Sequence, residues 1–298
     1  MADSTVTGAS GTEPAMAGTG RAGPLRRVAV HVLDASGVRL REDEVITEEP
    51  LQVRVDPGAG AVSVAVTMRT PGHDFELAVG FLYGEGLLSG CGDVRAVRYC
   101  ADAAVEQRYN VVTVELSRQS RLRPEELADA RRATVTSSAC GVCGVSSLEQ
   151  VRARLPQPLR SAVEVSAEVL AGLPELLRQQ QRLFDHTGGL HAAGLFTRDG
   201  EPLLVREDVG RHNAVDKVVG ALLLADRLPG SDQILVVSGR AGFEIVQKAA
   251  AAGIPLVASV SAPTSLAVDL ARDRGLTLVG FVREGRMTVY AGSQRVRT

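Results

Sequence analysis

The sequence predicts an α/β protein, α+β overall, in which a β-rich N-terminal domain precedes an α/β domain with a mostly parallel central sheet. Two observations support this prediction. Short runs of alternating apolar and polar residues fill the first half, and nearly continuous apolar runs separated by helical stretches fill the second. A length of 298 residues fits two domains better than one, because single hydrophobic cores stop growing near ~250–300 residues.

The first half opens with a segment that we expect to be disordered. Residues 1–24 are mainly Gly, Ala, Ser and Thr in no periodic order, a composition that buries too little apolar surface to offset the entropy of ordering. Alternation then predicts strands with one solvated face at residues 28–33, 51–55, 62–68 and 110–116. A breaker at Thr70-Pro71-Gly72-His73-Asp74 precedes apolar residues at helical spacing, so a helix is expected at residues 75–82.

The second half has the pattern of strands that are covered on both faces. Apolar runs occupy residues 234–237, 256–260 and 276–281, and helices are expected between them at residues 243–251 and 265–274. This β-α-β-α-β order predicts right-handed crossovers and a parallel core. We place a β-rich domain at residues 25–160, ending in a cysteine loop and a helix, and an α/β cofactor-binding domain at residues 161–298.

Composition limits the classes of partner and the compartment. A formal net charge of -2 gives no whole-protein attraction to nucleic acid or to an anionic membrane, so any anion site must be local. No apolar run is long enough to span a bilayer, and the N-terminus lacks the pattern of a secretory signal. Four cysteines do not form the dense framework of a secreted mini-domain. We therefore expect a cytoplasmic protein with reduced thiols.

The strongest chemical signal is the pair Cys140 and Cys143, which lies in Ser137-Ser138-Ala139-Cys140-Gly141-Val142-Cys143-Gly144. A glycine after each cysteine permits a tight backbone. Ser146-Ser147-Leu148-Glu149 matches a capping box, and a helix that starts there favours thiolate over thiol nearby. The pair is therefore interpreted as a reactive, sulfur-accepting thiol loop with both cysteines as candidate catalytic residues.

Three other interpretations of the cysteine pair fit the sequence less well. A closed zinc site needs four ligands, and Cys91 and Cys100 are too far apart in sequence to form a second knuckle. Because cysteine is among the most often buried residue types, we expect Cys91 and Cys100 to be buried and inert. A thioredoxin-like exchange site would lie early in a βαβ unit, which this pair does not. A zinc deaminase would need an H-x-E motif, and the sequence has none. No metal site is predicted.

Candidate anion and nucleotide sites follow the apolar runs of the second half. Ser238-Gly239-Arg240 and Ser261-Ala262-Pro263-Thr264 stand at strand-to-helix turns, where free backbone N–H groups can bind phosphate, although neither is a recognised phosphate motif. Thr264 can also be only an N-cap, and Arg240 only a solvated side chain. The final candidate segment offers arginine donors and one aromatic ring. It consists of Phe281, Val282, Arg283, Glu284, Gly285 and Arg286.

The stretch of residues 206–217 carries many polar groups and is interpreted as the wall of a polar pocket. Gly210 is expected at a turn, and Asp208 or Asn213 at a helix start. Arg211 and His212 are therefore expected near the N-terminus of that helix. A solvated charged face is the alternative. His186 and His191 lack a metal-ligand pattern and are expected to be supporting or core residues.

These motifs together resemble the FdhD family of sulfur carriers needed for active formate dehydrogenases. The resemblance rests on the cysteine motif and on several further segments in the same order along the chain. These are Glu49-Pro50-Leu51, residues 70–74, residues 187–193, residues 207–217, Ser238-Gly239-Arg240 and residues 261–264. Only the N-terminal tail lies outside this resemblance.

The resemblance implies a sulfurtransferase that receives persulfide sulfur from a cysteine desulfurase and passes it to the molybdenum bis(molybdopterin guanine dinucleotide) cofactor of formate dehydrogenase. By the same resemblance, Cys140 carries the persulfide, Cys143 is its partner thiol, and Phe281 to Arg286 bind the cofactor. A cytidine-deaminase-like second domain is also implied. The alternative is a cofactor-binding chaperone whose cysteines hold structural zinc or dock a partner. The sequence leaves the oligomeric state open, a homodimer included.

Overall fold

The structure, a computed structural model, describes residues 22–100, 109–123, 125–128, 158–159 and 161–298. Cys140, Cys143 and the expected capping box lie outside the described residues. The predicted α/β class is confirmed: helices cover sheets that mix parallel and antiparallel strands. The domain boundary near residue 160 and the cytidine-deaminase-like comparison stay predictions. No helix among the described residues combines the length and apolarity needed to cross a membrane.

The N-terminal part contains a four-stranded sheet with one parallel pairing, between β3 and β6. Its strands in spatial order are β4 (Val62–Arg69), β3 (Glu49–Asp56), β6 (Val111–Leu116) and β5 (Val94–Tyr99). The alternate residues Leu51, Val53 and Val55 are at most 1% exposed and share a core with helix α1 (Asp74–Gly84). The predicted strands at 51–55, 62–68 and 110–116 and the helix at 75–82 are therefore confirmed, whereas β5 was missed.

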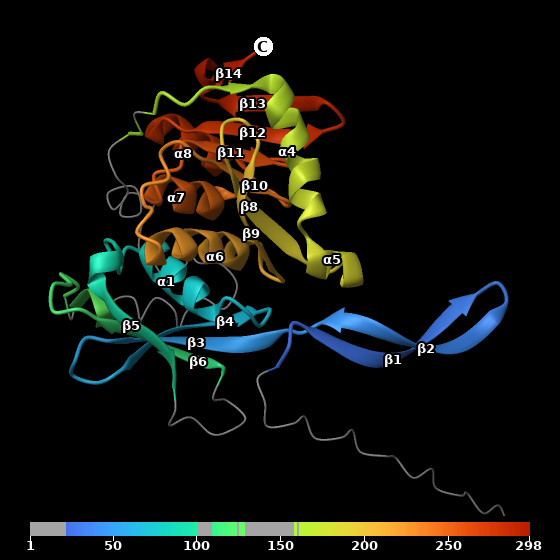
Figure 1. The fold of residues 1–298 in the computed structure, drawn as a ribbon, viewed down its shortest axis with the longest axis horizontal. Coiled ribbons are helices and arrows are strands. Elements are labelled where there is room, and N and C mark those ends of the chain that lie inside the picture. Colours follow the sequence, from blue (N-terminus) through green and yellow to red (C-terminus); the bar gives the residue numbers. More distant parts are fainter. Residues whose placement is uncertain (1–21, 101–108, 124, 129–157, 160) are drawn as a thin grey trace, which may run out of the picture.

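A separate two-stranded ribbon precedes this sheet. Strand β1 (Leu25–Asp34) pairs antiparallel with β2 (Gly37–Ile46), and the ribbon extends away from the rest of the molecule (Figure 1). The sequence predicted part of β1 and missed β2, because the charged β2 exposes both faces and lacks the alternation of a half-buried strand.

The C-terminal part is built on a six-stranded sheet. In spatial order its strands are β13 (Arg286–Ala291), β12 (Thr277–Arg283), β11 (Leu256–Ser259), β10 (Ile234–Val237), β8 (His191–Phe196) and β9 (Pro202–Asp208). The pairings of β11 with β10 and β12 are parallel, and the other three pairings are antiparallel. The expectation of a mostly parallel sheet is corrected to a mixed one, because antiparallel hairpins flank the parallel core on both sides.

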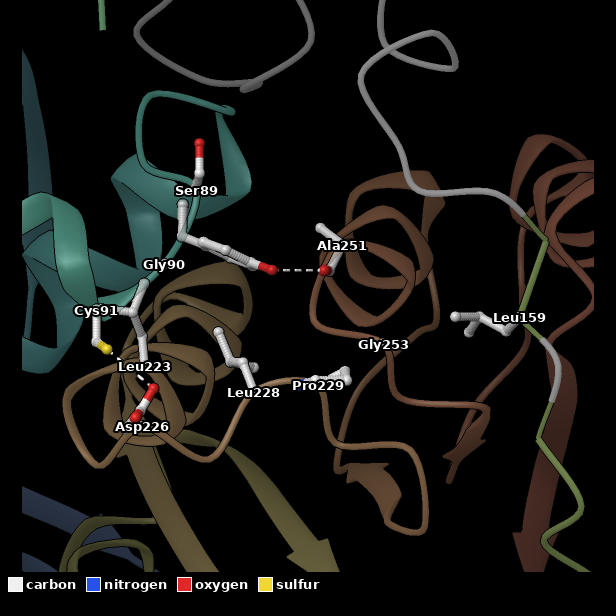
Figure 2. A pocket seen from close by; sticks show the side chains of 11 residues that line it. Ser89, Gly90, Cys91, Leu159, Leu223, Asp226, Leu228, Pro229, Ala251 and Gly253 are labelled. Carbon is white, nitrogen blue, oxygen red and sulfur yellow. Dashed lines mark hydrogen bonds between the residues drawn. The ribbon is translucent and has the colours of Figure 1, made fainter. Parts of the chain in front are cut away.

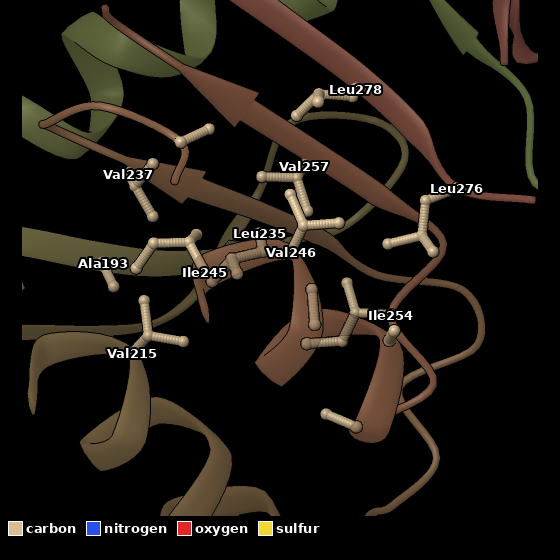
Figure 3. Close-up of a cluster of buried hydrophobic side chains, with 14 of the residues drawn as sticks. Ala193, Val215, Leu235, Val237, Ile245, Val246, Ile254, Val257, Leu276 and Leu278 are labelled. Atoms are coloured by element: carbon tan, nitrogen blue, oxygen red, sulfur yellow. The ribbon is translucent and has the colours of Figure 1, made fainter. Parts of the chain in front are cut away.

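Helices cover both faces of this sheet (Figure 1). On one face lie α6 (Arg211–Leu224), α7 (Phe243–Ala251) and α8 (Ser265–Arg274), and their apolar side chains form the core drawn in Figure 3. On the other face lies α4 (Ala167–Gln179), followed by α5 (Arg182–Thr187). Helices α7 and α8 have the predicted bounds. The small remaining elements are the pair β7 (Val165–Ser166) and β14 (Val296–Arg297) and the 3-10 turns η1 (Cys91–Asp93) and η4 (Ser293–Arg295).

The N-terminal and C-terminal parts meet where helices α1 and α6 cross. A Cβ added to Gly80 would lie 1.9 Å from the carbonyl oxygen of Asp216, and one added to Gly220 would lie 1.8 Å from that of Glu76. The two helices therefore touch backbone to backbone, which only glycine permits. This contact fixes the position of α6, whose N-terminus reaches the candidate site described below.

Candidate functional site

Residues from five segments that are distant in the sequence gather at one edge of the six-stranded sheet. The parallel strands β10, β11 and β12 end at this edge, and the antiparallel β8 begins there, since Ala193 pairs with Val237. Strand β9 ends at the same edge, where His191 pairs with Asp208. We call the resulting group the edge cluster. Its members are His191, Arg211, His212, Ser238, Arg240, Ser261 and Phe281.

The hydroxyl groups of two serines connect the loops of the edge cluster. Ser238 Oγ accepts a hydrogen bond of 2.9 Å from the backbone N–H of Ala192, so this serine extends the pairing of β8 with β10. Ser259, which is fully buried, donates from Oγ to the carbonyl oxygen of Gly239 at 2.8 Å and accepts from the N–H of Ser261 at 3.2 Å. Ser238 therefore supports the loop, and Ser259 is a residue that the sequence analysis missed. Its only signal was a serine at the end of an apolar run.

Three helices begin at or beside this edge and point their N-termini toward it. Helix α6 starts after Gly210, α7 after Gly242 and α8 after Thr264. The side chain of Thr264 accepts from the N–H of Ala267, which confirms the N-cap interpretation of this threonine. Helix N-termini favour anions, and Arg240 is exposed beside them. The edge is therefore suited to a negatively charged ligand.

Two histidines of the edge cluster are held in their neutral form. Burial and the positive charge of Arg211 lower the pKa of His212 to about 4, and the same two causes lower the pKa of His191. His212 Nδ1 lies 3.2 Å from Oε2 of Glu244, a carboxylate that can only accept. A neutral His212 therefore donates from Nδ1 and keeps Nε2 as an acceptor. The imidazole is oriented for hydrogen bonding with a ligand and does not serve as a second cation.

The predicted segment Phe281 to Arg286 forms the end of β12, a tight turn and the start of β13. A register shift between Gly280 and Arg283 marks a bulge, and Phe281 has a positive φ of 52° with its ring 38% exposed. Its backbone N–H donates to the carbonyl oxygen of Ser261 at 3.2 Å, which joins the backbone of Phe281 to the loop that follows β11. The Arg283 guanidinium carbon lies 6.0 Å from the ring centroid, at the limit of a cation–π contact.

The other members of this segment have different environments. Val282 is fully buried in the core beneath α4, so its side chain cannot contact a ligand. Glu284 and Gly285 both have positive φ, as a two-residue hairpin turn requires, and Glu284 Oε2 lies 3.2 Å from an Arg286 nitrogen. The segment therefore offers one aromatic ring and two exposed arginines, with Val282 as its anchor.

The stretch of residues 206–217 has two environments: Arg211 and His212 belong to the edge cluster, whereas Asp208, Asn213 and Lys217 form a buried network. Asp208 and Lys217, 0% and 1% exposed, form an ion pair of 2.7 Å. The Lys217 ammonium also donates to the carbonyl oxygen of Thr70 at 3.1 Å, and the Thr70 N–H donates to Asp208 at 3.2 Å. Asn213 donates to the carbonyl oxygen of Met68 at 2.7 Å. The charges of Asp208 and Lys217 are accommodated inside the protein because the backbone of Thr70 supplies hydrogen-bond partners to both.

A second buried ion pair lies deeper between α6 and α7. The Lys248 ammonium is 2.6 Å from Oδ1 of Asp216, and both side chains are at most 6% exposed. Although burial opposes the charge, the neighbouring carboxylates of Asp216 and Glu85 raise the pKa of Lys248. Arg206 and Glu76 add a bridge of 2.6 Å between β9 and α1. Together with the first network, these pairs join α1 to the α6 helix that carries Arg211 and His212.

A pocket of about 390 Å³ lies at the C-terminal ends of α6 and α7, and Cys91 is one of the residues that line it (Figure 2). Cys91 Sγ is 2.9 Å from Oδ1 of Asp226, and this hydrogen bond together with burial raises the pKa of the thiol. Cys91 and Cys100 are partly exposed, so the expectation that they are buried is wrong. A raised pKa nevertheless makes Cys91 a poor nucleophile.

Within the described residues, no group of three His, Cys, Asp or Glu side chains is arranged to hold a metal ion. Of the predicted site residues, the structure brings together Phe281, Ser261 and Ser238 with His191 and His212. His186 lies elsewhere, with Nδ1 at 3.1 Å from Glu44. The position of Cys140 and Cys143 relative to the edge cluster lies outside the described residues.

Comparisons with known proteins agree with these features. A family model described as the FdhD/NarQ family matches residues 46–297. Two curated relatives are both named "Sulfur carrier protein FdhD". The protein from Nocardia farcinica is 50% identical over 277 residues, covering 92% of this chain and 95% of the relative. The one from Streptomyces coelicolor is 52% identical over 275 residues, covering 91% and 95%.

A crystal structure from Desulfotalea psychrophila, assigned as that of a formate dehydrogenase accessory protein, has a similar fold. The TM-score is 0.70 at 22% sequence identity, and the match covers 92% of this chain and 99% of that one. At this identity, the likeness establishes the fold alone.

Proposed function

The chain belongs to the FdhD/NarQ family, and from this premise we propose that it is a sulfur carrier required for formate dehydrogenase activity. Cys140 accepts persulfide sulfur from a cysteine desulfurase, and the sulfur passes to the molybdenum bis(molybdopterin guanine dinucleotide) cofactor. The observation that carries this proposal is the identity of about half of the residues with relatives named as sulfur carriers, over nearly the whole chain. A cytoplasmic location fits a carrier that needs reduced thiols.

The first step is a thiol–persulfide exchange without net oxidation. The Cys140 thiolate attacks the outer sulfur of the desulfurase persulfide, a new S–S bond forms on Cys140, and the desulfurase cysteine leaves as a thiolate. Cys143 is the partner thiol of the same loop: its thiolate attacks the inner sulfur of the Cys140 persulfide, a Cys140–Cys143 disulfide forms, and the outer sulfur leaves at the sulfide level. Among the described cysteines, Cys91 is unsuited to this step because its hydrogen bond to Asp226 raises its pKa.

In this proposal the molybdenum cofactor is a substrate, and both the edge cluster and the segment from Phe281 to Arg286 fit its chemistry. Its phosphates are anions, and three helix N-termini and the exposed Arg240 surround the edge. A guanine ring is flat and offers acceptors, which match the exposed ring of Phe281 and the guanidinium groups of Arg283 and Arg286. Val282, Glu284 and Gly285 shape this segment through the core anchor and the turn.

The sulfur-transfer step can be tested by mass spectrometry after incubation with a cysteine desulfurase and free cysteine. We expect one added sulfur on the wild type and none on Cys140→Ala. Cys91→Ala is the matched control and should still gain the sulfur, because the raised pKa disfavours the Cys91 thiolate that would have to accept it. If Cys140→Ala still restored formate dehydrogenase activity, Cys140 would not be the carrier.

Cofactor binding at the edge cluster can be tested with GDP as a probe in titration calorimetry. Phe281→Ala and Arg283→Ala should each weaken binding by about 10-fold, because stacking on one base contributes ~1–3 kcal/mol. Val66→Ala, a surface change on β4 at a residue 59% exposed, is the control and should leave the affinity unchanged. Equal affinity in all three variants would show that guanine binds elsewhere.

The alternative chaperone function differs in its metal content. Metal analysis of the purified chain distinguishes the two functions, since one zinc ion per chain retained through chelation would favour a structural role for Cys140 and Cys143. Loss of persulfide formation in Cys140→Ala, without any bound zinc in the wild type, would favour sulfur transfer.

A further inference from the structure

The pocket at the C-terminal ends of α6 and α7 has a chemistry that differs from that of the edge cluster. Its volume of about 390 Å³ falls within the range of small-molecule sites. Helix α6 has 14 residues, so the pocket at its C-terminus and the edge cluster at its N-terminus are about 20 Å apart. The pocket is therefore a separate cavity, and its chemistry does not depend on the function proposed above.

Most of the pocket wall is apolar. Figure 2 shows Asp226 beside Cys91 at one end of the pocket and Leu159 at the other end. The hydroxyl group of Tyr83 donates to the carbonyl oxygen of Ala251 at 2.8 Å, so this polar group is satisfied within the protein. The apolar part of the wall comes from Leu159, Leu223, Leu228, Pro229, Ala251 and the ring of Tyr83. A ligand with an apolar body can bury that body against this wall.

The polar part of the pocket carries negative charge. Helices α6 and α7 end at the pocket, with Leu224 and Ala251 as their last residues, and helix C-termini carry partial negative charge. Asp226 adds a full negative charge. Among the described residues, Asp226 forms no ion pair, and none of those that line the pocket is Lys, Arg or His. Lys248, the basic residue in the last turn of α7, is already paired with Asp216. The pocket therefore favours a positively charged group.

Asp226 occupies a position where glycine is usual. Its N–H donates to the carbonyl oxygen of Leu223 at 3.0 Å, and the N–H of Arg227 donates to that of Leu222 at 2.8 Å. These are the two hydrogen bonds of a Schellman motif at the end of α6, which needs a positive φ at this residue. The φ of Asp226 is 53°, a conformation that strains a residue with a side chain.

The carboxylate of Asp226 is also unfavourable for α6, because it places a negative charge at a helix C-terminus. An asparagine would fit the same backbone conformation without that charge and would still accept a hydrogen bond from the Cys91 thiol. The stability of α6 therefore does not account for an aspartate at this position. A bound cation does account for it, because the cation would pair with the carboxylate and offset the repulsion.

We propose that this pocket binds an amphipathic cation, in which an apolar body ends in an ammonium or guanidinium group. The cationic group pairs with the Asp226 carboxylate and complements the C-termini of α6 and α7, while the apolar body packs against Leu228 and Pro229. Cys91 remains the hydrogen-bond donor that orients the carboxylate, and no covalent step is involved. A free amine and an arginine or lysine side chain of a partner protein both carry this chemistry.

Titration calorimetry of the full chain with phenylbutylamine and its neutral analogue phenylbutanol tests this proposal. The amine should bind with a dissociation constant on the order of 1 mM, and the alcohol about 10-fold more weakly, because it lacks the charge. Asp226→Asn should weaken binding of the amine by about 5-fold and leave that of the alcohol unchanged, since Asp226 is exposed and its ion pair is partly screened. Asp232→Asn is the matched control, because Asp232 is exposed nearby in the sequence but does not line the pocket. It should change the affinity for the amine by less than about 2-fold.

A second probe, Nα-acetylarginine amide, distinguishes the two sources of the cation. Tighter binding of this amide than of phenylbutylamine assigns the pocket to an arginine of a partner protein, and the reverse order assigns it to a free amine. In either case, Asp226→Asn must weaken the tighter probe. Absence of binding by both cations at about 10 mM overturns the proposal. Equal affinity for the amine and the alcohol, or equal weakening by the two Asp→Asn variants, also overturns it, because the pocket would then not recognise charge through Asp226.

Discussion

The glycine at position 220 gives the sharpest test of how the two halves of the chain are joined. In Gly220→Ala, the new Cβ would lie 1.8 Å from the carbonyl oxygen of Glu76 and 2.9 Å from the backbone nitrogen of Gly80. These neighbours are helix backbone and cannot rotate away as a side chain would. Helices α1 and α6 must therefore separate.

The size of the effect follows from this overlap. An ordinary contact begins near 3.4 Å, so the helices must move apart by about 1.5 Å at this point. Overpacking costs ~1–3 kcal/mol, and the rigid backbone on both sides places this site near ~3 kcal/mol. Alanine regains ~1 kcal/mol through its higher helix propensity. The net expected loss of unfolding free energy is about 2 kcal/mol, or ~4–8 °C in Tm.

Thermal and urea unfolding, followed by circular dichroism, measure this loss. Gly172→Ala is the matched control, because Gly172 lies inside α4 and an added Cβ there meets nothing within 4 Å. This control should gain up to ~1 kcal/mol from helix propensity alone. The two Gly→Ala variants should thus differ by about 3 kcal/mol, with opposite signs relative to the wild type.

A clear result would refute the reasoning. If Gly220→Ala were as stable as the wild type while Gly172→Ala showed its expected gain, α1 and α6 would not touch backbone to backbone. The burial of the ion pairs beside that crossing would then need another explanation as well.

Three further predictions concern charged and titratable groups. Lys248→Met should lower the unfolding free energy by about 3–5 kcal/mol in urea titrations, because it leaves the Asp216 carboxyl buried without its cation. The double variant that also carries Asp216→Leu should recover most of this loss. Alkylation of Cys91 at pH 8 should be slow and should accelerate in Asp226→Asn, because removing the carboxylate lowers the raised pKa of the thiol. An unchanged alkylation rate would contradict the hydrogen bond between Cys91 and Asp226. The His212 ring should titrate near pH 4 in an NMR titration. Because this folded-state pKa lies below the ordinary 6.5, the contribution of His212 to stability should be complete above pH 6.5 and should decrease as the pH falls toward 4. A titration midpoint near 6.5 would contradict the burial of His212.

The sequence predicted those elements whose local pattern reflects burial. Strand β10 and helices α7 and α8 have the predicted bounds, because continuous apolar runs and helical spacing are properties of neighbouring residues. Strands β2 and β5 were missed because neither is fully buried on either face, so their side chains carry little alternation. The mixed character of the large sheet was also missed, since strand direction is set by pairing partners.

In the candidate site too, features with a local sequence pattern were predicted, and features that depend on the pairing of distant segments were not. The turns after β10 and β11 and the segment from Phe281 were found from the sequence, because strand ends and turn residues are local signals. The sequence could not show that β8 and β9 bring His191 and Asp208 to the same edge, because this depends on antiparallel register between distant segments. The support that Ser259 gives to the Gly239 loop was hidden for the same reason.

By itself, the sequence determined the fold class and the family resemblance and predicted a reactive cysteine pair, because each depends on residue types in local order. Only the tertiary structure decided which charged residues are buried and which are exposed at the edge cluster. Asp208 and Lys217 have the composition of a solvated or ligand-binding stretch, yet they are buried because the backbone of Thr70, more than a hundred residues earlier in the chain, completes their hydrogen bonds. A buried charge is stable only where its partners are supplied, and in this protein those partners come from the other half of the chain.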